Sequence, residues 1–478
     1  MTHAEAVAEL NALERQHDVH GLVWRGVHVW PVFRMAIGEH LLSDHLSRSL
    51  PVLQEHGPWG KLKTLLRGSL QRAALSMRTD RALLYFSTHN NERTRSAGKE
   101  RNRFVHPLLA ERTTIDAPPF VVEHLKGLPS AFPELPSRNR CDASDMLQAA
   151  AYLHWRKPLP RLTDIPHAAD LLGAVKAKHS AFDPRAVADR LHNFEFYRAF
   201  HQRLLGLVEP TFAFAISWYN VENMALAHAC HERGTLFVDM QHGVQGPAHL
   251  AYGKWACMPR NGWTIMPSIF WCWDGPSASN INKWTGSTRH RALVLGHPWL
   301  RTAEPRHAPS IWANDGRMRA LFTLQPLARP LPNGLPETIA RTSDTVQWII
   351  RAHPNRVDML ADVEAELERC GVRHLVTFDA ARDTPLPSVL AGCDVHVTQY
   401  SSVVLEASYV GIPSIATHPS ATALYADGLA AGTLIMAENA EALCTALADL
   451  ETTRDQRAPA PQHNAPLATL LASVRQAQ

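Results

Sequence analysis

Short apolar runs alternate with amphipathic segments after Tyr197, which is the pattern of strands and helices in turn. The strands predicted in the first set are residues 212–220, 235–243, 268–274 and 291–297. A helix is predicted over 221–234, where Gly234 stands at the end and suits a left-handed C-cap. Strands that alternate with helices form parallel sheets, so the pattern predicts an α/β protein with ligands at the carboxyl ends of its strands.

The alternation is interrupted once and then resumes. Residues 301–316 are polar and contain prolines, so we predict a domain boundary there. The segments predicted beyond it are strands at 319–325, 346–353, 374–378, 394–400 and 412–418, and helices over 358–370, 402–410 and 439–450. We therefore expect two Rossmann-like domains that face a cleft.

The first part of the chain has a helical and basic pattern. Residues 1–56 carry apolar positions on a helical period, and in 57–80 such positions recur at intervals of three and four with Lys and Arg between them. An apolar strand at 81–88 is predicted to open into a polar loop, 89–104. Residues 57–104 hold eleven Lys and Arg against three Asp and Glu, a net charge of +8. Such a region fits an anionic membrane surface, an anionic acceptor or an ordinary solvated helix face.

Composition narrows the class of protein. The chain has 478 residues, of which 45% are hydrophobic, and a formal charge of +3, so it has enough apolar residues for real cores and lacks the basic excess of a nucleic-acid coat. Its seven cysteines are scattered without CxxC spacing, which fits a reducing compartment. We read neither an export signal at the charged start of the sequence nor an apolar run of 18 residues, so we expect a cytoplasmic protein.

Several common cofactor motifs are missing from the sequence. Neither GxxxxGK[ST] nor GxGxxG occurs, which argues against a P-loop nucleotidase and a typical dinucleotide-dependent dehydrogenase. His228 and His231 have a spacing that suits a metal, but two ligands on one helix are too few. We predict no metal site and no obligatory cofactor.

Two predicted strand ends carry groups that suit a phosphate. Residues 349–356, IIRAHPNR, end a strand with Arg351 and His353, and Pro354 terminates the element. In residues 397–415 a strand ends at Ser401 and Ser402, and Glu406 follows one turn into the next helix. Paired hydroxyls at a helix start either cap the helix or bind a phosphate, and the carboxylate could bind ribose hydroxyls.

A third strand end carries a histidine. Gln241, His242 and Gly243 close the predicted strand at 235–243, and the glycine allows a sharp turn of the backbone. A histidine with an unperturbed pKa near 6.5 suits general-base chemistry at neutral pH. A structural histidine is the alternative interpretation of the same residue.

These motifs together resemble a family. The RAHP segment and the double serine of QYSS, in a second Rossmann-like domain, resemble the GT-B-fold glycosyltransferases that use cytidine-nucleotide donors, such as bacterial capsule Kdo-transferases and sialyltransferases. They also resemble the CDP-glycerol and CDP-ribitol phosphotransferases of teichoic-acid and capsule synthesis, although Gln399 stands where those enzymes have an acidic residue. The QHG triplet is similar to one in capsular polysaccharide transferases. The resemblance covers about residues 210–450.

The resemblance implies a division of labour between domains and residues. The domains it implies are a helical region (1–80), an acceptor domain (81–304), a nucleotide-donor domain (305–452) and a tail (453–478) that can pack back as a helix. Donor-binding candidates are Gln325, Arg351, His353, Pro354, Ser401, Ser402 and Glu406. Acceptor-binding candidates are Arg93, Arg95, Arg101 and Gln241. His242 is the first candidate for the base, with Glu92 and Glu222 in reserve.

The function that this resemblance implies is a cytoplasmic glycosyltransferase, peripheral on the inner face of the membrane. It would move a sugar from a nucleotide donor, in the first place a CMP-Kdo-like one, to a bacterial surface polysaccharide, lipopolysaccharide or other glycolipid. Three alternatives stay open: a CDP-polyol phosphotransferase, a sugar-nucleotide 2-epimerase and an inactive GT-B scaffold protein. The identity of the sugar, its linkage and the oligomeric state are not encoded in these motifs.

Overall fold

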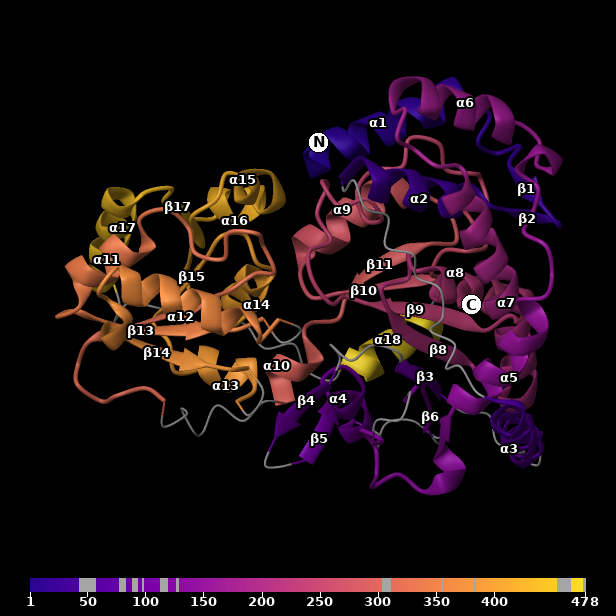
Figure 1. Ribbon diagram of the computed structural model, residues 1–478, viewed down its shortest axis with the longest axis horizontal. Helices are drawn as coiled ribbons and strands as arrows, with labels where there is room; N and C mark the ends of the chain where they lie inside the picture. The colour runs from indigo at the N-terminus through magenta and orange to yellow at the C-terminus, as the bar shows by residue number, and fades with distance from the viewer. Residues whose placement is uncertain are drawn as a thin grey trace. The chain divides into compact units, whose positions relative to one another are not determined.

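The computed structural model describes residues 1–42, 57–76, 83–87, 93–96, 99–111, 119–125, 129–302, 311–353, 356–381, 384–453 and 466–475. They fall into two compact units, each with its own hydrophobic core (Figure 1). Unit 1 comprises Met1–His89, Glu111–Leu295 and Leu467–Gln478, and unit 2 comprises Asn90–Ala110 and Gly296–Pro466. The chain therefore passes from one unit to the other more than once.

Unit 1 is built on a seven-stranded parallel sheet. Its strands are β3 (Leu83–Ser87), β6 (Pro119–Glu123), β7 (Arg140–Asp142), β8 (Phe212–Ile216), β9 (Leu236–Met240), β10 (Ile269–Cys272) and β11 (Arg291–Val294). They lie in the order β11-β10-β9-β8-β3-β6-β7, so the direction of winding reverses between β3 and β8. Strands β6, β8 and β10 are buried along their whole length, as expected for a parallel sheet that is covered on both faces.

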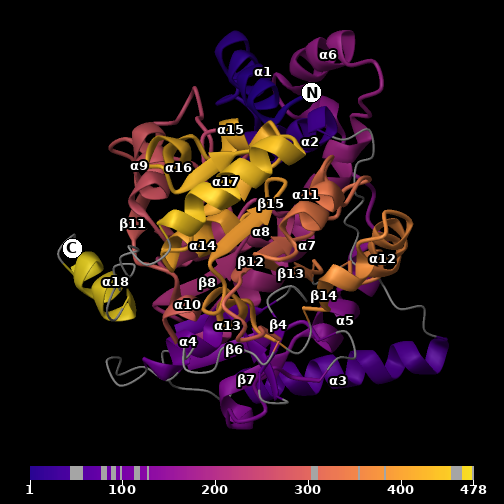
Figure 2. The ribbon, with the colours of Figure 1, turned by 90° about the vertical axis from the view of Figure 1, so that its left-hand side faces the viewer.

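Helices surround this sheet. They are α1 (His3–Gln16), α2 (Trp30–Leu42), α3 (Pro58–Ser76), α5 (Ser144–His154), α6 (Ala168–Lys178), α7 (Arg185–Val208), α8 (Val221–Arg233), α9 (Gly275–Thr285) and α18 (Pro466–Arg475), with 3-10 turns at Ser137–Asn139 and Leu162–Asp164 and a small hairpin of β1 (Val23–Trp24) and β2 (Val27–His28). The 19-residue α3 is seen side-on in Figure 2. Helix α8 ends at Gly234, whose φ of 70° is the left-handed conformation predicted for it.

The amino-terminal helices pack on unit 1 around a buried ion pair. Arg34 on α2 pairs with Glu14 on α1, and both side chains are completely buried. The guanidinium also donates to the carbonyl oxygen of Lys254 (3.0 Å), and Trp30 Nε1 donates to Glu14 Oε1 (2.9 Å). Because a buried charge is tolerated only with such partners, this network fixes how α1 and α2 lie on the unit.

Unit 2 is built on a six-stranded parallel sheet. Its strands are β12 (Met318–Thr323), β13 (Val346–Arg351), β14 (Val376–Asp379), β15 (Val395–Thr398), β16 (Ser414–Ala416) and β17 (Leu434–Met436). They lie in the order β14-β13-β12-β15-β16-β17, so the winding reverses between β12 and β15. This is the strand order of a doubly wound nucleotide-binding sheet.

The remaining elements of unit 2 are helices and one charged hairpin. The helices are α4 (Val105–Ala110), α10 (Pro298–Thr302), α11 (Leu335–Thr342), α12 (Met359–Arg369), α13 (Leu386–Leu390), α14 (Val403–Tyr409), α15 (Ser420–Leu424), α16 (Ala426–Ala430) and α17 (Ala440–Thr452), with a 3-10 turn at Arg373–Leu375. Figure 2 shows α17 across one face of the sheet, where its apolar side chains join the core with α11. The hairpin consists of β4 (Arg93–Ser96) and β5 (Lys99–Asn102).

The predicted fold class is confirmed: two parallel α/β sheets and a helical amino-terminal region are present. The loop predicted at 89–104 is wrong, because its charged residues form β4 and β5 without the apolar alternation that marks a strand. Strands β6 and β7 lie in a proline-rich region where we predicted none. The division into units falls at Gly296 and assigns residues 90–110 to unit 2, whereas the predicted domains divide near residue 305.

No helix within the described ranges is both long and apolar enough to cross a bilayer.

Candidate functional site

The carboxyl edge of the unit 2 sheet carries the first group of candidate residues. At the point where the strand order reverses, Gln325 follows β12 and Tyr400 follows β15. The Gln325 Oε1 atom accepts a hydrogen bond from the Tyr400 N–H (2.7 Å), and the Thr398 hydroxyl donates to the Thr323 carbonyl oxygen (3.1 Å). These bonds tie the two strand ends together at the switch point of the sheet.

A pocket of about 420 Å³ lies at this edge. Its lining residues follow β12, β15, β16 and β17, and they are Leu327, Arg329, Leu331, Pro332, Asn333, Gln399, Tyr400, Thr417, His418, Pro419 and Glu438. The Gln399 amide donates to the carbonyl oxygens of Arg329 and Pro330 (2.9 Å each), so it fixes the loop that forms one wall. The neutral amide of Gln399 thus holds this loop, whereas the phosphotransferases that the motifs resemble have an acidic residue at this position.

The pocket combines aromatic faces with both signs of charge. The rings of Tyr400 and His418 lie 5.0 Å apart between centroids, and burial raises the pKa of the Tyr400 hydroxyl. The Tyr425 hydroxyl donates to the Tyr400 carbonyl oxygen (3.1 Å), which holds that backbone in place. Arg329 and Glu438 add a cation and a carboxylate to the wall.

The paired serines follow the same strand end. Both are half-buried, and the Val403 N–H donates to Ser401 Oγ (3.3 Å). Ser402 occupies the N-cap position of α14 with a helical backbone, and its side chain makes no capping hydrogen bond. Helix capping therefore explains the Ser401 hydroxyl but not the Ser402 hydroxyl, which makes no capping hydrogen bond.

Arg351 is held within the sheet. Its buried guanidinium pairs with Asp379 at the end of β14 and donates to the Thr384 carbonyl oxygen (2.9 Å). Burial lowers the pKa of Arg351, and the Asp379 carboxylate opposes that shift. The predicted phosphate contact of Arg351 remains a prediction, but its guanidinium already binds two groups. Pro354 lies outside the described residues.

His353 is joined by an arginine that the sequence analysis missed. The side chain of His353 is half-buried, and burial followed by the charges of Arg103 and Arg356 lowers its pKa. Arg103 belongs to unit 2, where its Cζ lies 5.6 Å from the centre of the Trp299 ring, and its charge also lowers the pKa of His297. We missed Arg103 because we assigned the basic run at 99–104 to the first domain.

Glu406 is directed to a histidine inside the protein. Its Oε1 atom lies 3.6 Å from Nε2 of His297, and both side chains are almost completely buried. Burial lowers the pKa of His297, and the Glu406 carboxylate opposes that shift. The predicted ribose contact of Glu406 remains a prediction.

The carboxyl edge of the unit 1 sheet brings together His242 and two hydroxyls. His242 Nε2, after β9, lies 3.0 Å from Ser217 Oγ and 3.2 Å from the Tyr219 hydroxyl, both of which follow β8. Ser217 has a φ of 59°, a left-handed conformation that costs a non-glycine residue about 1–2 kcal/mol. Burial raises the pKa of Tyr219 to about 12, so its hydroxyl keeps its proton at neutral pH.

A buried carboxyl group supports this arrangement. Asp239 on β9 is fully buried, accepts from the Trp218 N–H (3.0 Å) at Oδ1 and from the Tyr252 hydroxyl (2.7 Å) at Oδ2. Because Trp218 stands between Ser217 and Tyr219, this carboxyl fixes the turn that presents both hydroxyls. Burial raises the pKa of Asp239 to about 8, against the effect of its two hydrogen bonds.

Gln241 has a structural place that the motif did not reveal. The side chain is fully buried. Its Nε2 donates to the Gly243 carbonyl oxygen (2.9 Å), and its Oε1 accepts from the Trp273 N–H (2.6 Å). Both ends of the amide are used to join the loops after β9 and β10, which argues against the predicted acceptor contact.

The other predicted acceptor and reserve residues are only partly described. Glu222 lies in the first turn of α8, directly after the Ser217 turn. Arg93 lies on β4 and Arg95 two residues further, while Arg101 is a half-buried residue of β5, so all three belong to unit 2. Glu92 lies outside the described residues. The acceptor roles of these residues remain predictions.

The described part of the chain contains no group of three or more His, Cys, Asp or Glu side chains placed to hold a metal ion. Hydroxyls and cations at a sheet edge suit a phosphate, and an imidazole between two hydroxyls suits proton transfer.

Comparisons with known proteins add a likeness in fold. No family model and no curated protein matches the chain. A structure from Listeria monocytogenes, assigned as a UDP-N-acetylglucosamine 2-epimerase, is 13% identical, and the match covers 83% of this chain and 96% of that one with a TM-score of 0.52. A Neisseria meningitidis UDP-GlcNAc 2-epimerase bound to UDP-GlcNAc is 10% identical, with coverage of 83% and 100% and a TM-score of 0.48. The wall teichoic acid polymerase TagF is 10% identical, with coverage of 84% and 90% and a TM-score of 0.41.

The first of these matches shows that the fold is the two-sheet α/β fold of GT-B type. At this identity it shows nothing about the reaction.

Proposed function

We propose that the protein is a glycosyltransferase that transfers a sugar from a nucleotide donor. The observation that carries the proposal is the pocket at the switch point of the unit 2 sheet, with hydroxyls, an imidazole and a cation at adjoining strand ends. Its volume of about 420 Å³ falls in the range of small-ligand sites. In this proposal unit 2 binds the donor, and unit 1 carries the group that activates the acceptor.

The nucleoside would occupy the pocket itself. A nucleobase can stack on the ring of Tyr400 or of His418, whose planes are tilted by 49° to each other. The Glu438 carboxylate would accept hydrogen bonds from ribose hydroxyls, in place of the buried Glu406. The motif resemblance favours cytidine as the base, and no contact in the pocket selects it over uridine.

The phosphate would bind beside the pocket. Ser402 and Ser401 present hydroxyls at the end of β15, and His353 and Arg103 provide imidazole and positive charge near the end of β13. These groups would stabilise the negative charge that develops on the leaving phosphate, which is electrostatic catalysis of the oxyanion-hole kind.

His242 would act as the base in unit 1. As the acceptor oxygen forms its bond to the anomeric carbon, its proton passes to His242. The bond from that carbon to the donor phosphate breaks, and its electron pair leaves with the nucleotide. Ser217 and Tyr219 would keep the imidazole oriented, since both hydroxyls reach its Nε2 atom. The products are then the glycosylated acceptor, the free nucleotide and a proton that His242 returns to solvent.

The proposal also includes the acceptor of the sugar and the place in the cell where the transfer occurs. The resemblance favours a growing surface polysaccharide or glycolipid made at the inner face of a cytoplasmic membrane. The proposal needs no metal and no cofactor besides the donor.

The experiment is a thermal unfolding series with a panel of nucleotides and sugar nucleotides based on cytidine, uridine and guanosine. We expect cytidine compounds to raise the Tm of the parent and His374→Ala proteins, and about tenfold higher concentrations to be needed for His418→Ala. His374 is an exposed histidine of unit 2 and serves as the control. Selective stabilisation by uridine compounds would remove the cytidine assignment. Stabilisation by none would remove the donor site and favour a scaffold protein.

Product analysis then separates the enzymes. The stabilising donor is incubated with and without lipid-linked saccharide acceptors, and the products are identified by mass spectrometry. Transfer of the sugar to an acceptor supports the proposal. An epimerised sugar nucleotide formed without acceptor, or transfer of a polyol phosphate, would replace it with one of its two rivals.

A further inference from the structure

Helix α3 presents its apolar residues to solvent. The side chains of Trp59, Leu62, Leu66 and Leu70 are 83%, 47%, 58% and 70% exposed. They are spaced by three and four residues, so they form one stripe along the helix. An amphipathic helix of a globular protein normally buries such a stripe, and α3 does the reverse.

The buried face of α3 is made of small and polar residues. Thr64 and Gly68 are buried, four residues apart. A Cβ atom at Gly68 would lie 3.1 Å from the carbonyl oxygen of Asp145 and 3.3 Å from the Cβ of Ala149, both on α5. The glycine thus permits a close approach of the two helices, and this contact fixes the apolar stripe on the outside.

The exposed face of α3 carries only positive charge. Lys63 and Arg67 are exposed beside the stripe, and the helix contains no Asp or Glu. Lys61 Nζ lies 5.6 Å from the centre of the Tyr152 ring on α5, so this cation faces the protein. Lys63 and Arg67 lie next to the apolar stripe in sequence, as in helices that lie flat in the interface of a bilayer. A partner that fits such a surface has an apolar interior and anionic groups at its surface.

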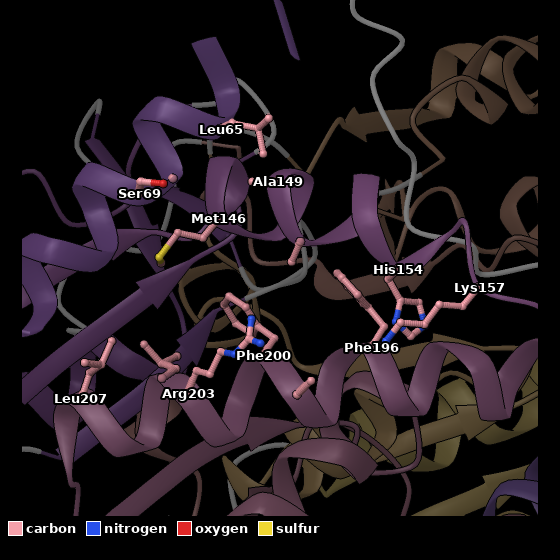
Figure 3. A pocket seen from close by; sticks show the side chains of 14 residues that line it. Leu65, Ser69, Met146, Ala149, His154, Lys157, Phe196, Phe200, Arg203 and Leu207 are labelled. Carbon is pink, nitrogen blue, oxygen red and sulfur yellow. The ribbon is translucent and has the colours of Figure 1, made fainter. Parts of the chain in front are cut away.

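A largely apolar cavity lies beside α3. It has a volume of about 490 Å³ and lies between α3, α5 and α7 (Figure 3). Leu65 and Ser69 come from α3, and Phe200 and Leu207 come from α7. Lys157 and Arg203 add two cations to the lining. An apolar hollow with cations suits a hydrocarbon chain whose headgroup is anionic.

We propose that α3 docks unit 1 on an anionic phospholipid bilayer. Trp59, Leu62, Leu66 and Leu70 enter the interface, the two cations beside this stripe contact lipid phosphates, and the cavity accepts one hydrocarbon chain. A second copy of the chain fits the same surface poorly, because a symmetric contact would bring the cations of two copies together. This proposal does not depend on the transferase reaction.

The test is flotation of the full chain with vesicles of phosphatidylcholine alone or with about one third phosphatidylglycerol. We expect binding to the anionic vesicles and its loss at high salt, since each surface cation strengthens binding about fivefold. The double variant Lys63→Gln/Arg67→Gln should bind about 25-fold more weakly. The matched control, Lys176→Gln/Lys283→Gln, removes two exposed charges elsewhere on unit 1 and should bind like the parent.

A second variant tests the apolar stripe. Leu62→Ser/Leu66→Ser lies on the exposed face, so folding measured by circular dichroism should be unchanged while flotation is reduced at least about tenfold. Equal flotation with neutral and anionic vesicles, or equal binding by the charge variant and its control, would overturn the proposal. Light scattering that shows a dimer broken by the leucine variant would assign the face to a second copy instead.

Discussion

His242 stands between two hydroxyls whose backbone is fixed by a strained turn and a buried carboxyl group. This is a costly arrangement for a histidine with no more than a packing role, since Ser217 is left-handed and Asp239 is buried. The geometry fits an imidazole that must keep one orientation while it gains and loses a proton. The same atoms predict how single substitutions act.

Removal of the imidazole should slow transfer strongly and leave the donor bound. We expect His242→Ala to lower kcat about 10²–10⁴-fold, the usual contribution of a general base, with nucleotide affinity unchanged. Ser217→Ala should have a smaller effect in the same direction, because the imidazole keeps its contact with Tyr219. Steady-state kinetics with isothermal titration of the nucleotide measures both quantities, and full turnover by His242→Ala would remove it as the base.

A second histidine predicts a pH dependence of stability. His396, on β15, is fully buried with its ring nitrogens 2.8 Å from Thr323 Oγ1 and 2.9 Å from Ser414 Oγ, and burial lowers its pKa to about 3. Between pH 3 and about 6.5 the unfolded chain binds a proton that the folded protein does not, so the free energy of unfolding falls as pH falls. The contribution is about 1.4 kcal/mol per pH unit below 6.5 and is fully restored above that pH.

Urea denaturation between pH 7 and pH 5 measures this slope. We expect His396→Gln to reduce it by about 1.4 kcal/mol per pH unit, although the variant is less stable at neutral pH. His374→Gln, which changes an exposed histidine of the same unit, should retain the parent slope. An unchanged slope in His396→Gln would show that this imidazole is not the group responsible.

Single residues also show which parts of the candidate sites could be predicted from the sequence. His242, His353, Gln325 and the paired serines were chosen as candidates because each follows an apolar run, and parallel strands end at one edge of their own sheet. Arg103 could not be found in that way, because a charged hairpin far away in sequence brings it to unit 2. Nor does a short motif tell a ligand-binding amide from a buried one: the Gln241 amide is buried and accepts a hydrogen bond from the Trp273 N–H.

At the scale of elements, the contact of α3 with α5 depends on one glycine. Gly68→Leu should lower the free energy of unfolding by about 1–3 kcal/mol, because its side chain meets the backbone of α5. The control is Gly173→Leu in the middle of α6, where a Cβ would meet no atom within 4 Å and helix propensity should add about 0.5–1 kcal/mol. Chemical denaturation compares the two, and equal effects would contradict the close packing.

A substitution in the segment that contains β4, β5 and α4 tests the proposed phosphate contact of Arg103. Arg103→Gln should weaken binding of a nucleoside diphosphate about tenfold and leave binding of the free nucleoside unchanged, because a charged hydrogen bond to phosphate is lost. The pKa of His353 should rise in the same variant, since the Arg103 charge lowers it. Titration calorimetry and histidine NMR measure the two effects, with the exposed Arg369→Gln as control. Equal losses for nucleoside and diphosphate would rule out a phosphate contact.

The pattern of apolar residues predicted the strands correctly wherever the apolar runs were long. The strands predicted after Tyr197 match β8 to β16, and all except β14 end two to four residues earlier than predicted because polar residues at their ends continue into the loops. Short β7 and β17 have three residues each, too few to show a period, and β4 and β5 contain only polar and charged residues.

At the scale of the whole molecule, two doubly wound sheets give two switch points with different chemistry. The unit 2 edge carries a pocket with aromatic rings, hydroxyls, one cation and one carboxylate, and the unit 1 edge carries an imidazole between two hydroxyls. The path of the chain could not be predicted in the same way. Residues 90–110 join unit 2 and Leu467–Gln478 joins unit 1 through tertiary contacts, such as the Leu467 N–H with Glu111 (3.1 Å), that leave no local pattern.

Hydrogen–deuterium exchange with mass spectrometry, in the presence and absence of the nucleotide that stabilises the protein most, tests the central claim most directly. We predict slower exchange in the loops after β12, β15 and β16, at residues 325–333, 399–402 and 417–419, and unchanged exchange in α1 and α2 of unit 1. At a nucleotide concentration near the parent Kd, His418→Ala should reduce this protection and His374→Ala should retain it. Protection confined to unit 1, or absent from the loops that line the unit 2 pocket, would contradict a donor site at the switch point of unit 2.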